Sequence, residues 1–197
     1  MTTFVHTLSP VSVTPAMTIT LNTPVDTKTL SMNDPALSAM TDLTRNKAVT
    51  VNPNNSIEFA KELMKYAGVR LLLVINNENH LLGLVTYRDF IGEKVINIIA
   101  KEHVTREHIQ VGQVMTRLPD LNPFMYTDIE HSTIKNVIGF LREVGRQHAI
   151  VIEPLDDNDN YFIRGIFSVT HIGRLLGMDV SSDDHVQSFA DFEKLMA

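Results

Sequence analysis

Apolar side chains follow two different periodicities between residues 48 and 99. Between residues 57 and 67 they recur at helical spacing, which predicts an amphipathic helix. Residues 71–75 are apolar without alternation, as expected for a strand that is covered on both faces. The predicted elements, in order, are a strand at residues 48–51, a helix at 57–67, strands at 71–75 and 81–85, and a second helix that begins at Thr86 and continues to Ile99.

The ends of the first helix carry capping signals. Asn55 and Glu58 have the spacing of an N-cap residue and its partner three positions later. Gly68 is well placed to end the helix in the left-handed conformation, which glycine adopts without a steric penalty. Ser132 and Gly145 are expected to delimit an equivalent helix further along the chain.

The same block of sequence occurs twice. The segment that begins at Asn55 is echoed from Ser132, at an offset of 77 residues (132 minus 55). After five extra residues in the second copy, residues 83–89 (Gly-Leu-Val-Thr-Tyr-Arg-Asp) meet residues 165–171 (Gly-Ile-Phe-Ser-Val-Thr-His). A repeat of this length is a structural unit, so we expect an α+β fold in which a β-α-β-β-α unit occurs twice. The predicted boundaries are residues 39–103 for the first repeat and 111–177 for the second.

Two terminal segments lie outside the repeats. Residues 1–38 are rich in Thr, Ser and Pro, which is typical of an extended arm with at most one edge strand. Residues 178–197 place apolar side chains at roughly helical spacing and predict a short amphipathic helix packed on the body.

Composition excludes several classes of protein. The 197 residues carry a formal net charge of −6 and no dense cluster of Lys and Arg, so nucleic acid is not an expected partner. No apolar run approaches the roughly 18 to 20 residues that a membrane span requires. The absence of cysteine excludes disulfides, and the N-terminus does not resemble a secretory signal, so a cytoplasmic location is expected.

Metal and catalytic sites are not predicted. His103 and His108 are five positions apart, which does not put them on one helix face as a helical zinc site requires. No nucleophile motif, phosphate-binding P-loop or cysteine nucleophile is present. Ser168 and His171 lie within one turn, but no acid is placed to orient the histidine. We therefore expect a protein that is not an enzyme.

The element order, the Met-Thr pairs at 40–41 and 115–116, the hairpin and the Gly-h-h-[Ser/Thr]-x-x-Asp ending (h, apolar) together resemble the cystathionine β-synthase (CBS) domain. The resemblance covers about residues 39–177 in two tandem copies. It implies an intramolecular pseudo-dimer, or Bateman module. The clefts of such modules bind adenosyl ligands such as AMP, ADP, ATP or S-adenosylmethionine.

Thr86 and Asp89 can be interpreted in two ways. By spacing alone they form a capping box that starts a helix. The same geometry suits a ligand, because a helix N-terminus with a free hydroxyl accommodates phosphate and a carboxylate can accept both hydroxyls of a ribose. The resemblance to a CBS pair favours ligand contact. It implies a nucleotide site made of Thr86, Asp89, Leu84 below the base, Arg70 and Arg88 toward the phosphate, and Met125 and Tyr126 closing the cleft.

The second cleft departs from the family pattern. Ser168 keeps the hydroxyl, but His171 stands where the first repeat has Asp89, and a neutral imidazole offers one acceptor where a ribose diol needs two. We expect this cleft to bind weakly, to stay empty or to prefer a different ligand. Its expected lining is Ser168, His171, Ile166, Thr44, Val49, Val69 and His148.

The function expected from this resemblance is regulatory. A single adenosyl nucleotide per chain would act as ligand of a sensor that requires no cofactor and passes its signal to an unidentified protein target. Stacking of two modules through the second helix of each repeat would give a homodimer, with a contact face of Val95, Ile98, Ile99, Leu175 and Leu176. The alternative is a purely structural dimerisation module without a physiological nucleotide.

Overall fold

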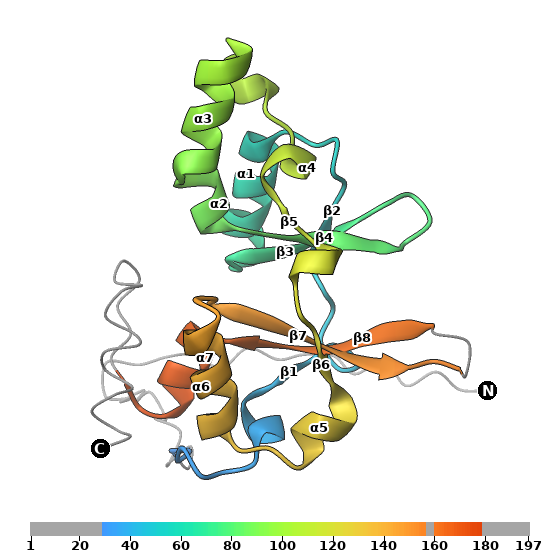
Figure 1. Ribbon diagram of the computed structural model, residues 1–197, viewed down its shortest axis with the longest axis vertical. Helices are drawn as coiled ribbons and strands as arrows, with labels where there is room; N and C mark the ends of the chain where they lie inside the picture. The colour runs from blue at the N-terminus through green and yellow to red at the C-terminus, as the bar shows by residue number, and fades with distance from the viewer. Residues whose placement is uncertain (1–28, 157–159, 179–197) are drawn as a thin grey trace, which may run out of the picture.

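A computed structural model of the protein describes residues 29–156 and 160–178. Within these residues the chain forms two four-stranded sheets, each covered by helices on its outer side (Figure 1). The sheets face each other across the middle of the molecule, which confirms the predicted α+β pair. The predicted C-terminal helix and most of the N-terminal arm lie outside the described residues.

The first sheet has the strand order β2-β3-β4-β5. Strand β3 pairs in parallel with β2 and antiparallel with β4, and β4 pairs antiparallel with β5. The central residues of β3 are buried, as its continuous apolar sequence predicts. The strands are β2 (Thr50–Val51), β3 (Leu71–Ile75), β4 (Leu81–Thr86) and β5 (Thr116–Arg117).

Helix α1 (Ile57–Ala67) packs its apolar face on this sheet. Its N-cap is Ser56, whose hydroxyl accepts a hydrogen bond from the backbone N–H of Phe59 at 3.2 Å, so the predicted cap at Asn55 is wrong by one residue. Gly68 ends the helix in the left-handed conformation, with φ of 66°, as predicted.

The second helix of the first repeat is broken. Helix α2 (Tyr87–Ile91) ends at Gly92, and α3 (Glu93–Glu102) starts directly after it. Gly92 has an extended backbone, with ψ of 178°, which interrupts the helical hydrogen bonds. The prediction of one continuous helix from Thr86 to Ile99 was therefore wrong.

The second sheet has the order β1-β8-β7-β6 and repeats the same pairing pattern. Its strands are β1 (Thr41–Asp42), β6 (Phe124–Met125), β7 (His148–Pro154) and β8 (Tyr161–Ser168). Its helices are α5 (Tyr126–Glu130), α6 (Ile134–Glu143) and α7 (Val169–Leu175). Thr133, rather than the predicted Ser132, caps α6 by accepting a hydrogen bond from the backbone of Asn136.

Each sheet is completed by the segment that leads into the other repeat. Strand β1 follows a short 3-10 helix (Ala36–Ala39) and pairs with β8, while β5 follows α4 (Val111–Val114) and pairs with β4. Two further 3-10 turns, Arg106–His108 and Leu118–Asp120, flank α4 and β5. The described end of the arm, residues 29–38, therefore packs on the second repeat, where Met32 and Ala36 are buried.

A glycine allows each of these exchanged segments to approach its sheet. A Cβ on Gly83 of β4 would collide with the carbonyl oxygen of Thr116 in β5. A Cβ on Gly165 of β8 would collide with the side chain of Met40, which precedes β1. Close backbone approach thus requires the glycine at position 83, whereas at position 165 the neighbour is a flexible methionine side chain.

The two repeats meet through an apolar layer between the sheets. Leu73 and Leu84 come from the first sheet, and Ile150 from the second, with Leu121 buried beside them. Burial of such side chains contributes about 1.5–3 kcal/mol each, so this layer fixes the position of one repeat on the other.

Candidate functional site

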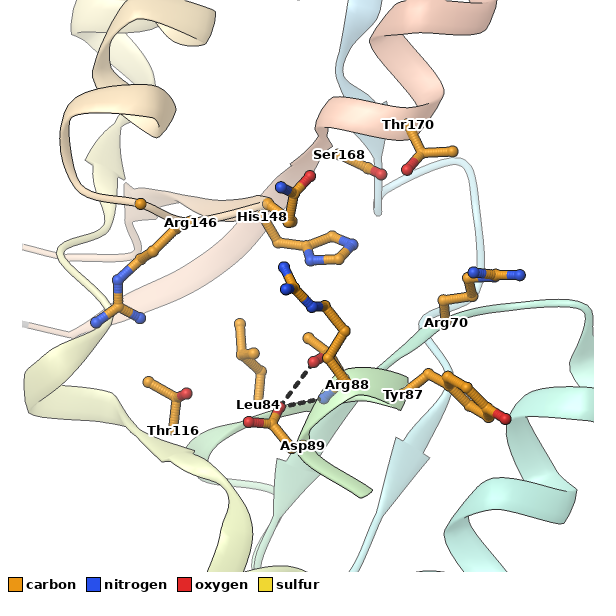
Figure 2. Close-up of a pocket in the computed structure, with 13 residues that line it drawn as sticks. Arg70, Leu84, Tyr87, Arg88, Asp89, Thr116, Arg146, His148, Ser168 and Thr170 are labelled. Carbon is orange, nitrogen blue, oxygen red and sulfur yellow. Dashed lines mark hydrogen bonds between the residues drawn. The ribbon is translucent and has the colours of Figure 1, made fainter. Parts of the chain in front are cut away.

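A cavity of about 270 Å³ lies between the repeats, at the end where β4 runs into α2 and β8 runs into α7 (Figure 2). We call it the first cavity. The first repeat, together with strand β5 of its sheet, supplies Arg70, Leu84, Thr86, Tyr87, Arg88, Asp89 and Thr116, and the rest of the second repeat supplies Gly145, Arg146, Gln147, His148, Ser168 and Thr170.

The carboxylate of Asp89 is the hydrogen-bond acceptor at the start of α2. Its Oδ2 accepts from the backbone N–H of Thr86 at 2.8 Å and from the hydroxyl of Thr86 at 2.7 Å. The other oxygen, Oδ1, lies 3.6 Å from Nζ of Lys94. A hydroxyl has one proton, so Thr86 turns only its oxygen lone pairs to further partners. Thr86 and Asp89 together therefore present acceptors, which suit the hydroxyl donors of a sugar better than a phosphate.

The opposite part of the first cavity is cationic. Arg88 reaches from the start of α2 toward His148 of the second repeat, and Arg70 and Arg146 stand on either side (Figure 2). The guanidinium carbon of Arg70 lies 5.9 Å from the centre of the Tyr87 ring. The first cavity therefore has two parts. The oxygens of Thr86 and Asp89 suit hydroxyl groups of a ligand, and the arginines suit its anionic groups.

Five of the seven residues predicted for this site come together in the first cavity. They are Arg70, Leu84, Thr86, Arg88 and Asp89.

Met125 and Tyr126 are not among its lining residues. Met125 ends β6 and Tyr126 begins α5, where the guanidinium of Arg164 lies 4.9 Å from the ring centre. The reason is an insertion. Val51 pairs with Val74 and Phe124 with Val151, so the inner strands keep the offset of 77 residues while the outer strands are 73 apart (124 minus 51). Helix α5 accounts for the missing four (77 minus 73).

Several lining residues were not predicted for this site. Thr116, Arg146, Gln147 and Thr170 were missed altogether, and the repeat offset itself contained a signal, since it pairs Arg70 with Gln147. The side-chain oxygen Oε1 of Gln147 is buried and has no hydrogen-bond partner among the described residues. A buried acceptor without a partner costs about 1–3 kcal/mol, which a donor group on a ligand would recover.

A second cavity, of about 330 Å³, adjoins the first and corresponds to the predicted second cleft. Six of its seven predicted residues line it, namely Val49, Val69, His148, Ile166, Ser168 and His171. Thr44 does not, because its hydroxyl donates to Asp42 at 2.6 Å and accepts from Arg164 at 2.9 Å. Burial, with a smaller effect from the positive charge of Arg174, lowers the pKa of His171.

Comparison with protein-family models matches residues 40–96 to the CBS domain. The first repeat is a CBS domain. The fold of the described chain is that of a tandem CBS pair, and solved structures share it. No significant match occurs among curated protein sequences.

Three solved structures illustrate the shared fold. An uncharacterized conserved protein from Pyrococcus horikoshii has 21% identity and a TM-score of 0.53, over 78% of this chain and 99% of that one. A conserved CBS domain protein from Thermoplasma acidophilum has 19% identity and a TM-score of 0.53, over 80% and 76%. Protein MJ1225 from Methanocaldococcus jannaschii has 20% identity and a TM-score of 0.52, over 71% and 49%. At these identities the likeness concerns the fold alone.

The structure has two further features that bear on function. Among the described residues, no helix is long and apolar enough to cross a membrane.

The surface of the first CBS domain exposes Ile91, Ile96 and Ile99, whereas Val95 is buried and Ile98 packs on the core. Leu175 and Leu176 pack on the core of the second repeat. The predicted contact face on the second helices was therefore wrong for Val95, and the exposed large apolar residues of α3 are Ile96 and Ile99.

Proposed function

We propose that the CBS pair binds one adenosyl nucleotide in the first cavity and acts as a regulatory sensor rather than an enzyme. The observation that carries the proposal is the pairing of two acceptors, Thr86 and Asp89, with three arginines around one cavity between the repeats. A nucleotide has this same division, with hydroxyl donors on its sugar and negative charge on its phosphates.

Each part of such a ligand has a partner of matching chemistry. The ribose hydroxyls donate to Asp89 Oδ1 and to the lone pairs of Thr86, and Leu84 offers an apolar surface to the base. The phosphate lies toward Arg88 and Arg70, whose guanidinium groups can bind phosphate oxygens in pairs. S-adenosylmethionine is disfavoured because its sulfonium would add positive charge beside three arginines.

The sensor mechanism follows from the position of the first cavity. Its lining residues belong to both repeats, for example Asp89 to the first and Arg146 to the second. A ligand that contacts both binds most tightly to one relative placement of the repeats and shifts the population toward it. A protein target or a second copy of the chain that contacts both repeats would detect this shift.

Self-association is the second part of the proposal. Large apolar side chains on the surface of α2 and α3, with Ile96 exposed by 63% and Ile91 by 58%, favour contact with a second copy of the chain. This contact is compatible with nucleotide binding and would let two CBS pairs respond together.

The decisive experiment compares nucleotide titrations of the wild type, Asp89→Asn and Asp128→Asn by calorimetry and thermal shift. Asp128 is the third residue of the five-residue helix α5, as Asp89 is of α2, so it is a matched control. Asparagine preserves the cap, because Asn136 Oδ1 accepts from Thr133 N and Oγ1 at 2.9 and 2.7 Å in the same way.

We expect Asp89→Asn to weaken AMP binding about tenfold, since one charge-assisted hydrogen bond becomes neutral, and Asp128→Asn to leave it unchanged. Saturating AMP, at about 100 times its dissociation constant, should add about 2.7 kcal/mol to the stability of the wild type. Equal AMP affinity in all three proteins, or no binding of AMP, ADP or ATP, would refute the proposed site.

A further inference from the structure

The first and second cavities share one wall. Arg70, His148, Ser168 and Thr170 line both of them. These residues come from the ends of the two hairpins, where Thr86 is paired with Leu71 and Ser168 with His148. A ligand that leaves the first cavity along this wall therefore enters the second.

The second cavity is more cationic than the first. Lys47, Arg70 and Arg174 line it, and there is no carboxylate among the described residues that do. In the first cavity the charge of Asp89 offsets one of three arginines. The change from Asp89 to His171 between the repeats has removed the carboxylate that would repel an anion.

The hydroxyl of Ser168 in the second repeat also has a different hydrogen-bonding role from that of Thr86 in the first. Thr86 gives its proton to Asp89, whereas Ser168 Oγ accepts a hydrogen bond from the backbone N–H of His171 at 3.4 Å. The proton of Ser168 is therefore available to a ligand, and the hydroxyl of Thr170 lies beside it on the shared wall (Figure 2). Two hydroxyl donors and three cations are the partners of a phosphate chain, and they do not suit a ribose diol.

We infer that the second cavity is the phosphate-binding extension of the first, so that one nucleoside triphosphate, with its nucleoside at Thr86 and Asp89, occupies both. This inference rests on the proposed function and narrows the ligand from an adenosyl nucleotide in general to a nucleoside triphosphate. The sizes agree, because ligand sites commonly measure about 300–1,000 Å³ and the first cavity alone, at about 270 Å³, lies below this range. The second cavity, of about 330 Å³, offers further room for an extended phosphate chain.

The His171 imidazole is consistent with this assignment. Its pKa is lowered by burial and by Arg174, so the ring is mainly neutral near pH 7 and does not need a carboxylate partner. Protonation at lower pH would add a fourth positive charge beside Lys47, Arg70 and Arg174, together with any charge on His148. Anion binding in the second cavity should accordingly strengthen as the pH falls.

The test is calorimetric titration of AMP, ATP and inorganic tripolyphosphate into the full chain. His171→Asp restores the carboxylate of the first repeat and its Ser/Thr-x-x-Asp cap, so it should fold, and His131→Asp makes the same charge change at an exposed residue after α5. A second variant, Lys47→Gln with Arg174→Gln, removes two cations that line the second cavity and not the first.

We expect the wild type to bind one ATP per chain, about tenfold or more tighter than AMP, because two or more charge-assisted hydrogen bonds are added. Tripolyphosphate should bind and compete with ATP. The ratio of ATP to AMP affinity should collapse toward one in His171→Asp and in the Lys47/Arg174 variant, and should persist in His131→Asp.

Three outcomes overturn the inference: ATP binding no tighter than AMP, a ratio that survives both variants, or two nucleotides bound per chain. The first leaves the proposed nucleotide site intact. If neither AMP nor ATP binds, the proposed function fails, and tripolyphosphate then decides whether the anion site exists. Its binding to the wild type with loss in His171→Asp supports the site, and no binding refutes it.

Discussion

The hydroxyl of Thr86 donates its single proton to the carboxylate of Asp89, with Oγ1 and Oδ2 2.7 Å apart. The same hydrogen bond thus caps helix α2 and orients the oxygens of the proposed ribose site. Asp89 Oδ2 also accepts a hydrogen bond from the backbone N–H of Thr86, which fixes the direction of the carboxylate. The cap and the ligand site, which the sequence presented as alternatives, are compatible in this geometry.

Replacing the Thr86 hydroxyl tests this relationship. Thr86→Val keeps the shape of the side chain but leaves Asp89 with one hydrogen bond fewer, so we expect stability to fall by about 1 kcal/mol and AMP affinity to fall with it. Thr86→Ser should retain both. Denaturant unfolding and AMP titration measure the two effects. A Thr86→Val protein that binds AMP as tightly as Thr86→Ser would exclude the hydroxyl from the site.

A second relationship, between Gly83 and Thr116, predicts opposite effects for two glycine substitutions. Gly83→Ala places a methyl group against the carbonyl oxygen of Thr116, which is backbone and cannot rotate away. We expect a loss of about 1–3 kcal/mol in the free energy of unfolding. Gly139→Ala, inside α6 with nothing within 4 Å of the new Cβ, should stabilise by about 1 kcal/mol. Chemical denaturation of both variants checks the signs, and a neutral Gly83→Ala would contradict the close approach of β5 to β4.

Much of this fold follows from local patterns in the sequence. The buried strand β3 and the left-handed cap at Gly68 were predicted because they depend on neighbouring residues only. The duplicated motif also predicted the junction of strand and helix where Thr86 and Asp89 lie, and the structure places both residues in the lining of the first cavity.

The remaining features depend on contacts between distant segments. The short helix α5 shifts the outer strand of the second repeat by four residues relative to the helix that follows, and this moved the predicted Met125 and Tyr126 away from the first cavity. The packing of Met32 on the second repeat involves residues more than 100 positions away, and nothing in the local sequence indicates it. Arg146 and Gln147 likewise become site residues only through the placement of one repeat on the other.

Self-association through α3 can be tested with one charge. Ile96 is exposed by 63%, so Ile96→Glu should leave the fold of the chain intact while placing a charge in the apolar contact. We expect the wild type to be dimeric and Ile96→Glu to be monomeric in analytical ultracentrifugation at the same concentration. Tyr161→Glu, at an exposed aromatic on β8, is the control and should remain dimeric. A monomeric wild type, or a dimer that survives Ile96→Glu, would remove α3 from the interface.

His171 predicts how stability depends on pH. Its pKa in the folded protein is lowered from 6.5, first by burial and then by Arg174, so below pH 6.5 the unfolded chain binds more protons at this residue than the folded chain. The stabilising contribution is complete above pH 6.5 and is lost as the pH falls through the folded pKa. The slope stays below about 1.4 kcal/mol per pH unit, the value for one full proton, and water around a half-buried ring reduces it further. We expect His171→Gln to flatten the decline in melting temperature of the ligand-free protein below pH 6.5, and His131→Gln to retain it. An unchanged decline in His171→Gln would show that other groups cause it.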